Sequence, residues 1–170
     1  SIIFWLKKNF KIKKNKVFFN FTSIYFPFQF LIFLIYAQII FGAFVSGLDA
    51  GKIYQTWPLM GENFLPDDLI LKNISDAFVF ENHSLVQFYH RNLAYFITLY
   101  SLCLAFFIYK KKFVILFKPL KIFLLILFLQ ASFGVLTLVS DLNIYLASIH
   151  QITGLLLVIS ALNLYYLRVK

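Results

Sequence analysis

The sequence predicts an all-α membrane protein in which four transmembrane helices form a four-helix bundle of two pseudo-symmetric hairpins. Three observations support this fold class. Apolar residues make up 61% of the chain and charged residues only 14%, whereas soluble domains average about half and about a quarter. Four apolar stretches each reach the roughly 20 helical residues that cross a bilayer. Basic and acidic residues flank these stretches on opposite sides.

The four spans follow one another along most of the chain. A basic segment, residues 1–23, comes first, and the bundle is expected over residues 24–167, with an outer loop at 47–85 between its first two spans. Pro119 opens the third span in a first turn, where a missing N–H costs little. The predicted spans are Ile24–Ser46, Val86–Tyr109, Pro119–Ser140 and Ile144–Leu167.

The charges predict the orientation of these spans. Lysines and arginines gather before the first span, between the second and third, and after the fourth, while all seven acidic residues lie in the outer loop or the last turn. By the positive-inside rule, both termini are expected on the cytoplasmic side of a bacterial inner membrane, or on the matrix side of a mitochondrial one. The net charge of +9 is then a topology signal. We expect lipid around the helices and no nucleic-acid partner, because the basic residues flank spans and form no reading surface.

Two histidines, His90 and His150, are the candidate metal ligands. They lie roughly 6 and 9 Å inside the outer ends of the second and fourth predicted spans, at 1.5 Å per helical residue. Polar residues within a bilayer usually face the bundle interior and serve a site. Two imidazoles at matched depth on different helices can supply both axial ligands of a flat iron cofactor.

Three neighbours of the histidines are candidate cofactor-binding residues. Ala94 and Gly154 stand four residues after His90 and His150, on the same helical faces. Small residues there would let a macrocycle lie against the helix, or would permit tight helix packing in lipid; their matched placement favours the cofactor. Arg91 can pair with a carboxylate such as a haem propionate, or extend to lipid phosphate, and the sequence leaves this open.

A short internal repeat supports the pairing of the two histidines. The segments Gln38–Gly42 and Gln130–Gly134 share glutamine, phenylalanine and glycine at the same spacing, and a histidine-bearing span follows each. We interpret the repeat as two similar hairpins, with the glutamines making interhelical hydrogen bonds. The outer loop, rich in aromatic residues, would cover the edge of a cofactor or anchor the chain at the membrane interface.

These motifs together resemble the haem A synthase family. The run Phe41–Met60 (FGAFVSGLDAGKIYQTWPLM) carries the most specific signal, in its Gly-Leu-Asp-Ala-Gly loop. The segment Phe80–Asn82 leads into the second match, Val86–Tyr95 (VQFYHRNLAY), and Gln130–Gly134 followed by His150 gives the third. The matches occur in the family's order.

The resemblance implies a fold, an activity and a cofactor. Members of this family are eight-helix inner-membrane proteins with two similar four-helix halves. They oxidise a methyl group of haem O to the formyl group of haem A for cytochrome c oxidase assembly. This chain is similar to the C-terminal half, so the resemblance implies that His90 and His150 are the axial ligands of a haem b.

The resemblance also implies what this chain lacks. In the family's N-terminal half a catalytic glutamate stands four residues before a histidine, and here that position is Val86. We therefore assign no catalytic residue and expect an oxidoreductase that is incomplete as this chain alone. The implied partners are haem O as substrate, an N-terminal half or a second copy of the chain, haem O synthase and cytochrome oxidase assembly factors.

Two functions of other classes remain open from the sequence. A small b-type cytochrome would use the same ligand pair to pass electrons, without chemistry of its own. A membrane scaffold or carrier without haem would satisfy both histidines by hydrogen bonds alone.

Overall fold

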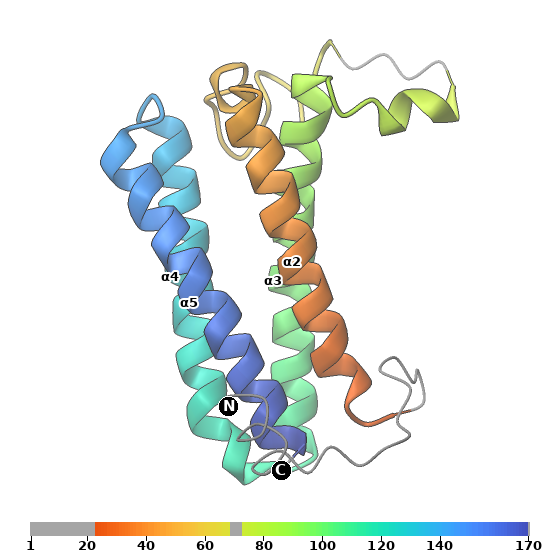
Figure 1. The fold of residues 1–170 in the computed structure, drawn as a ribbon, viewed down its shortest axis with the longest axis vertical. Coiled ribbons are helices and arrows are strands. Elements are labelled where there is room, and N and C mark those ends of the chain that lie inside the picture. Colours follow the sequence, from red (N-terminus) through yellow and green to blue (C-terminus); the bar gives the residue numbers. More distant parts are fainter. Residues whose placement is uncertain (1–22, 69–72, 170) are drawn as a thin grey trace, which may run out of the picture.

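Four long helices dominate the computed structural model, which describes residues 23–68 and 73–169 (Figure 1). The long helices are α2 (Phe26–Gly47), α3 (His83–Lys110), α4 (Phe117–Val139) and α5 (Ile144–Val169). Short 3-10 helices η1 (Ala50–Lys52), η2 (Ile74–Phe78) and η3 (Val114–Leu116) lie in the connections. All four long helices are long and apolar enough to cross a membrane, which confirms the predicted fold class. The predicted basic segment 1–23 lies outside the described residues, apart from Ser23.

The second span begins earlier than the sequence predicted. Helix α3 starts at His83 instead of Val86, because the Asn82 side chain accepts a hydrogen bond from the backbone N–H of Leu85 at 3.0 Å and caps the helix. His83, which was expected in the loop, is the exposed first residue of α3. The outer connection thus spans residues 48–82.

The distances of the two histidines from the outer ends of their helices differ less than the sequence predicted. Since α3 begins at His83 and α5 begins at Ile144, His90 lies about 10.5 Å and His150 about 9 Å along its helix, at 1.5 Å per residue.

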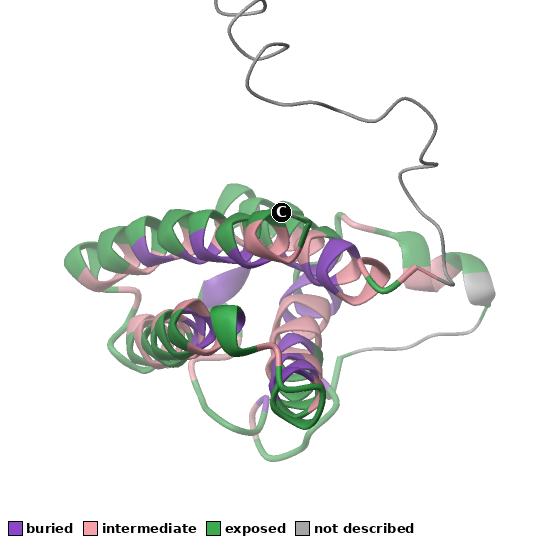
Figure 2. Ribbon diagram, turned by 90° about the horizontal axis from the view of Figure 1, so that it is seen from below, coloured by how far each residue is buried: buried purple, intermediate pink, exposed green. Residues whose placement is uncertain are grey.

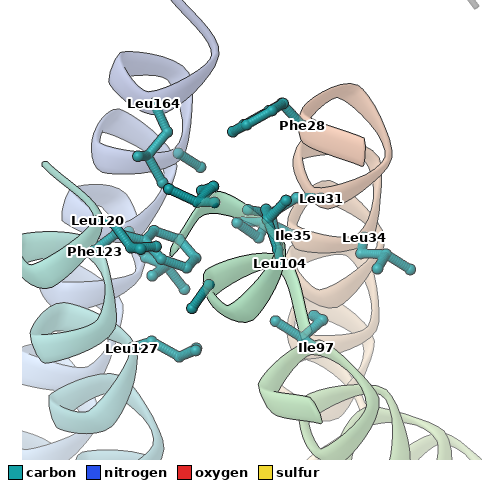
Figure 3. Close-up of a cluster of buried hydrophobic side chains, with 14 of the residues drawn as sticks. Phe28, Leu31, Leu34, Ile35, Ile97, Leu104, Leu120, Phe123, Leu127 and Leu164 are labelled. Atoms are coloured by element: carbon teal, nitrogen blue, oxygen red, sulfur yellow. The ribbon is translucent and has the colours of Figure 1, made fainter. Parts of the chain in front are cut away.

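The bundle consists of two hairpins, α2–α3 and α4–α5, that pack together at the inner end (Figure 1). This is the end that carries the connection between α3 and α4. Its core is a buried apolar cluster to which all four long helices contribute (Figure 3). Members with almost no exposed surface include Phe28, Leu31, Ile108, Leu120, Phe123 and Leu164. Toward the outer end the ribbons of the two hairpins diverge, and this cluster does not continue between them.

The outward faces of the helices are apolar and exposed. In the end-on view, exposed residues follow the outside of the bundle and buried ones the inside (Figure 2). Phe106 of α3 and Phe128 of α4 are 69% and 67% exposed. Lipid is as apolar as these side chains, so the helices associate through close packing rather than through the hydrophobic effect.

This packing predicts that Phe123 matters more than Phe128 on the same helix. Phe123→Ala should destabilise the bundle by about 2 kcal/mol, less than the ~3–5 kcal/mol typical of a soluble core, because the lost contribution is packing alone. Phe128→Ala, the matched control, should change stability little because its ring faces outward. Unfolding in mixed detergent micelles measures both, and equal losses would contradict the arrangement of α4.

Candidate functional site

His90 on α3 is held by two residues of α2. The Gln38 amide nitrogen, Nε2, lies 3.1 Å from His90 Nδ1 and donates to the His90 backbone carbonyl at 3.0 Å. One turn further along α2, Gly42 leaves room for the ring, since a Cβ there would lie 3.1 Å from His90 Cε1. The glutamine therefore fixes the ring by hydrogen bonds, and the glycine allows it to approach α2.

His150 on α5 is also held by two residues of the preceding helix, α4, although through different atoms. Its Nδ1 lies 3.0 Å from the backbone carbonyl oxygen of Gln130. A Cβ at Gly134, one turn further, would lie 2.9 Å from His150 Cε1. The Gln130 side chain lies between two α5 residues: its Oε1 accepts a hydrogen bond from the Thr153 hydroxyl, and its Nε2 lies 3.4 Å from His150 Nε2.

The two hairpins thus build equivalent half-sites in the outer half of the bundle. The repeat Gln38–Gly42 and Gln130–Gly134 supplies both, and each histidine comes from the following helix. Both histidines are partly buried. The repeat was evident from the sequence, whereas the role of its two glycines was not predicted, although their shared spacing could have indicated it.

The two histidines, His90 and His150, suit a cofactor that supplies most of the ligands of its own metal. Within residues 23–68 and 73–169, no group of three or more His, Cys, Asp or Glu side chains could hold a bare metal ion. The single cysteine, Cys103, is exposed. Two imidazoles are too few for a structural zinc site, which takes four protein ligands, but they suffice for a macrocycle that supplies four equatorial nitrogens.

Arg91 binds the outer loop. Its Nη2 donates to the carbonyl of Tyr54 at 2.6 Å, and its Nη1 to those of Thr56 at 2.9 Å and Leu59 at 3.2 Å. Gln87, one turn earlier, donates to the Tyr54 carbonyl as well, at 2.9 Å. This role of Arg91 was not predicted from the sequence, and its pairing with a propionate or a lipid phosphate stays a prediction.

Ala94 and Gly154, the two small residues predicted to lie against a cofactor, differ in their surroundings. Gly154 faces Gln130 of α4, where an added Cβ would lie 3.3 Å from the amide nitrogen; this contact matches the helix-packing alternative. Ala94 is partly buried one turn beyond His90. Their contact with a cofactor stays a prediction.

The outer loop joins the two hairpins at their diverging ends. Gln55 donates to the Asp141 carboxylate, in the turn before α5, at 2.7 Å. Nearby, Gly51 of η1 approaches Leu142 so closely that a Cβ would lie 3.0 Å from the leucine side chain. Met60 of the loop is buried, whereas Trp57 is 49% exposed. The loop therefore spans the outer end of the bundle and also presents an aromatic side chain outward.

The carboxylate of Asp68 attaches a second part of this loop to α3. Asp68 accepts from the Tyr54 hydroxyl at 2.7 Å and from the Ser84 hydroxyl at 2.6 Å. Desolvation acts to raise the pKa of Asp68, but the hydrogen bonds from Ser84 and Tyr54 outweigh it and the pKa is lowered. The hydrogen bond to Asp68, with a smaller effect of burial, raises the pKa of Tyr54. The loop is thus attached to α3 through Ser84 as well as through Arg91.

Comparison with known proteins shows the family of the chain. Residues 2–162 match the family model described as cytochrome oxidase assembly protein. The chain belongs to this family. It is 38% identical over 166 residues to the heme A synthase of Pelagibacter ubique, a match that covers 94% of this chain and 46% of that protein. It is 42% identical over 139 residues to the heme A synthase of Wolbachia pipientis wMel, covering 81% and 38%.

The chain spans less than half the length of these relatives. A third, the heme A synthase of Bartonella quintana, is 39% identical over 126 residues, which cover 74% of this chain and 35% of that protein. The matched region is the C-terminal portion of the relatives, as the resemblance predicted. No solved structure matches the chain.

The close approach at Gly134 gives a testable prediction. Gly134→Ala should force the His150 ring away from α4 and cost about 1–3 kcal/mol, because a Cβ at 2.9 Å overpacks the contact. Gly47→Ala is the matched control, since a Cβ there meets nothing within 4 Å. Thermal unfolding in detergent measures both variants. If Gly134→Ala is as stable as Gly47→Ala, the glycine does not make room for the ring.

The loop contacts of Arg91 give a second prediction. Arg91→Lys should loosen residues 54–59, because one ammonium group cannot reach three separate carbonyls as the guanidinium does. Amide hydrogen exchange in the loop should then become about tenfold faster, as expected from losing one charged hydrogen bond. Lys52→Ala removes only the exposed ion pair with Asp49 and should leave the loop unchanged. Equal exchange in both variants would show that Arg91 does not hold the loop.

Proposed function

We propose that this chain forms the haem-b-binding C-terminal half of a haem A synthase, with His90 and His150 as the two axial ligands. One observation carries the proposal. Each hairpin holds one histidine against a glutamine and a glycine of the preceding helix, at a similar distance from the start of its own helix. Membership of the family and the similarity to bacterial heme A synthases support it.

The residues present fit such a haem. His90 and His150 would hold its iron, and Gly42 and Gly134 let both rings pack back against their hairpins. The outer loop, attached through Arg91 and through the hydrogen bond between Gln55 and Asp141, would shield the site from the aqueous phase. When bound, the haem supplies one-electron redox chemistry.

The proposed role of this half is electron transfer to, or structural support of, the substrate site. Two imidazole ligands leave the iron no open position for a substrate or for oxygen. Val86, one turn before His90, is fully buried and apolar, so no carboxylate stands there. The oxidation of the haem O methyl group to the formyl of haem A is therefore assigned to the N-terminal half, with haem O synthase and assembly factors as partners. The proposed location is the bacterial inner membrane, with both termini cytoplasmic.

A second candidate is a b-type cytochrome without chemistry of its own. The two equivalent imidazole sites favour it as well, since they suit electron transfer regardless of any substrate. Coexpression of this chain with the N-terminal half of a relative separates the two functions. Conversion of haem O to haem A that depends on His90 supports the synthase, and conversion without this chain supports the cytochrome.

The ligand pair predicts the effect of single substitutions. His90→Ala and His150→Ala should each abolish the low-spin haem spectrum, because a bis-axial site loses a ligand in either variant. The matched control is His83→Ala, since His83 is exposed at the first position of α3 and should bind haem as the unmodified chain does. Absorption spectra of the oxidised and reduced proteins measure the outcome. An unchanged low-spin spectrum in both ligand variants would exclude the pairing.

A further inference from the structure

We propose that the inner end of the bundle binds the headgroup of an anionic phospholipid, at a site formed by the end of α5 and the connection between α3 and α4. The site consists of five basic residues, here called the inner cation cluster: Lys110, Lys111, Lys112, Lys118 and Arg168. This inference goes beyond the proposed function and does not depend on bound haem.

Two aromatic rings hold the guanidinium of Arg168 in the last turn of α5. Its Cζ lies 4.4 Å from the centre of the Phe113 ring and 5.5 Å from the centre of the Tyr25 ring. Phe113 belongs to the α3–α4 connection, and Tyr25 stands directly before α2. In Figure 1 the end of α5 and the α3–α4 connection lie together at the inner end. Arg168 is therefore fixed beside the lysines of the connection.

No acidic residue of the chain lies near the inner cation cluster. All seven Asp and Glu residues lie in the outer connection or in the turn before α5, at the opposite end of the bundle. Among the described residues, the buried Nε of Arg168 has no hydrogen-bond partner, although buried donors are nearly always paired. Clustered charges of one sign attract counter-ions. The anion that balances this cluster must therefore come from outside the chain.

The backbone conformation of Lys112 is strained. Helix α3 ends in a Schellman motif, in which the N–H of Phe113 donates to the carbonyl of Ile108 at 3.2 Å and the N–H of Lys112 donates to that of Tyr109 at 3.1 Å. The motif needs a left-handed residue, usually glycine, and Lys112 has this conformation with a φ of 53°. A side chain disfavours the left-handed region. Stability alone would therefore favour glycine over lysine here.

Lys118 also stands where helix stability would favour another residue. It is the second residue of α4, whose first turn contains no acidic residue. The N-terminus of a helix carries a partial positive charge, so a cation in the first turn opposes the helix dipole. A bound anion offsets this repulsion and that between neighbouring lysines. Lys112 and Lys118 are thus unfavourable for the fold and favourable for an anion.

Exposed apolar side chains beside the cations favour a lipid over a soluble anion. Val114 and Ile115 of η3, within the connection, are 70% and 65% exposed. The ammonium of Lys110 lies 6.0 Å from the centre of the Phe106 ring, which is also exposed. A ligand that matches both kinds of side chain has an anionic headgroup and acyl chains. Basic residues that flank membrane spans attract anionic lipids in this way.

Electron paramagnetic resonance of spin-labelled lipids tests the site. The whole chain is placed in phosphatidylcholine membranes with a trace of spin-labelled phosphatidylglycerol or phosphatidylcholine, and the lipid immobilised at the protein surface is measured. The chain should prefer phosphatidylglycerol by about tenfold or more, since each of several cations near a membrane surface contributes about fivefold. Equal immobilisation of the two lipids would overturn the inference.

Two lysine variants separate lipid binding from a role in the fold. Lys112→Gly and Lys118→Gln should each lower the preference for phosphatidylglycerol by about fivefold. Neither should lower the unfolding midpoint, because glycine tolerates the positive φ and glutamine does not oppose the helix dipole. Lys52→Gln, the matched control, removes the same charge at the outer end and should leave the preference unchanged. An equal loss in Lys52→Gln would show that only the net charge matters and would overturn the site.

Arg168→Gln tests the centre of the site. In high salt, which screens diffuse attraction, the unmodified chain should keep a preference for phosphatidylglycerol that Arg168→Gln loses. If Arg168→Gln impairs folding, the two lysine variants decide the question. Excess inorganic phosphate should not displace the lipid; displacement would indicate a site for a soluble anion and overturn the inference. All these measurements are made without haem, so their outcome leaves the proposed function untouched.

Discussion

A buried imidazole in a bilayer must find its hydrogen-bond partner within the protein, and this constraint organises the outer half of the bundle. Water cannot satisfy polar groups there, and each unsatisfied one costs several kcal/mol. Gln38 meets this need for His90 in one hairpin, and Gln130 meets it for His150 in the other. The close pairing that results requires a residue without a side chain one turn further along the same helix, at Gly42 in one hairpin. The hydrogen bonds to the histidines and the close approach of the paired helices thus depend on each other.

The inner end of the bundle holds the helices together, and the outer end carries the histidines. At the inner end, large apolar side chains such as Phe28 and Phe123 fill the space between the hairpins and hold them together. At the outer end the hairpins diverge, and the loop between α2 and α3 joins them again through Gln55 and Asp141. A rigid inner core allows a polar site to exist in the outer half without loss of the fold.

Hydropathy was sufficient to predict the four spans, because bilayer thickness fixes their length. The start of α3 was missed because its cap, Asn82, lies in a polar stretch where a helix and a loop look alike. The two histidines could be singled out as candidate ligands because a polar residue is conspicuous in an apolar span. The contact between Gly134 and His150 was not, since it depends on the relative register of two helices. The loop contacts of Arg91 were also beyond the sequence, because its partners are backbone carbonyls, which every residue carries.

The most direct test of the account is the electron paramagnetic resonance spectrum of the ferric haem bound to the chain. Two equivalent imidazole sites predict a low-spin signal typical of bis-histidine ligation, with nitrogen hyperfine couplings from two rings. A high-spin signal from a single imidazole, with the opposite axial position open or filled by water, would contradict the account. That result would mean that the matched half-sites at His90 and His150 do not bind one iron together.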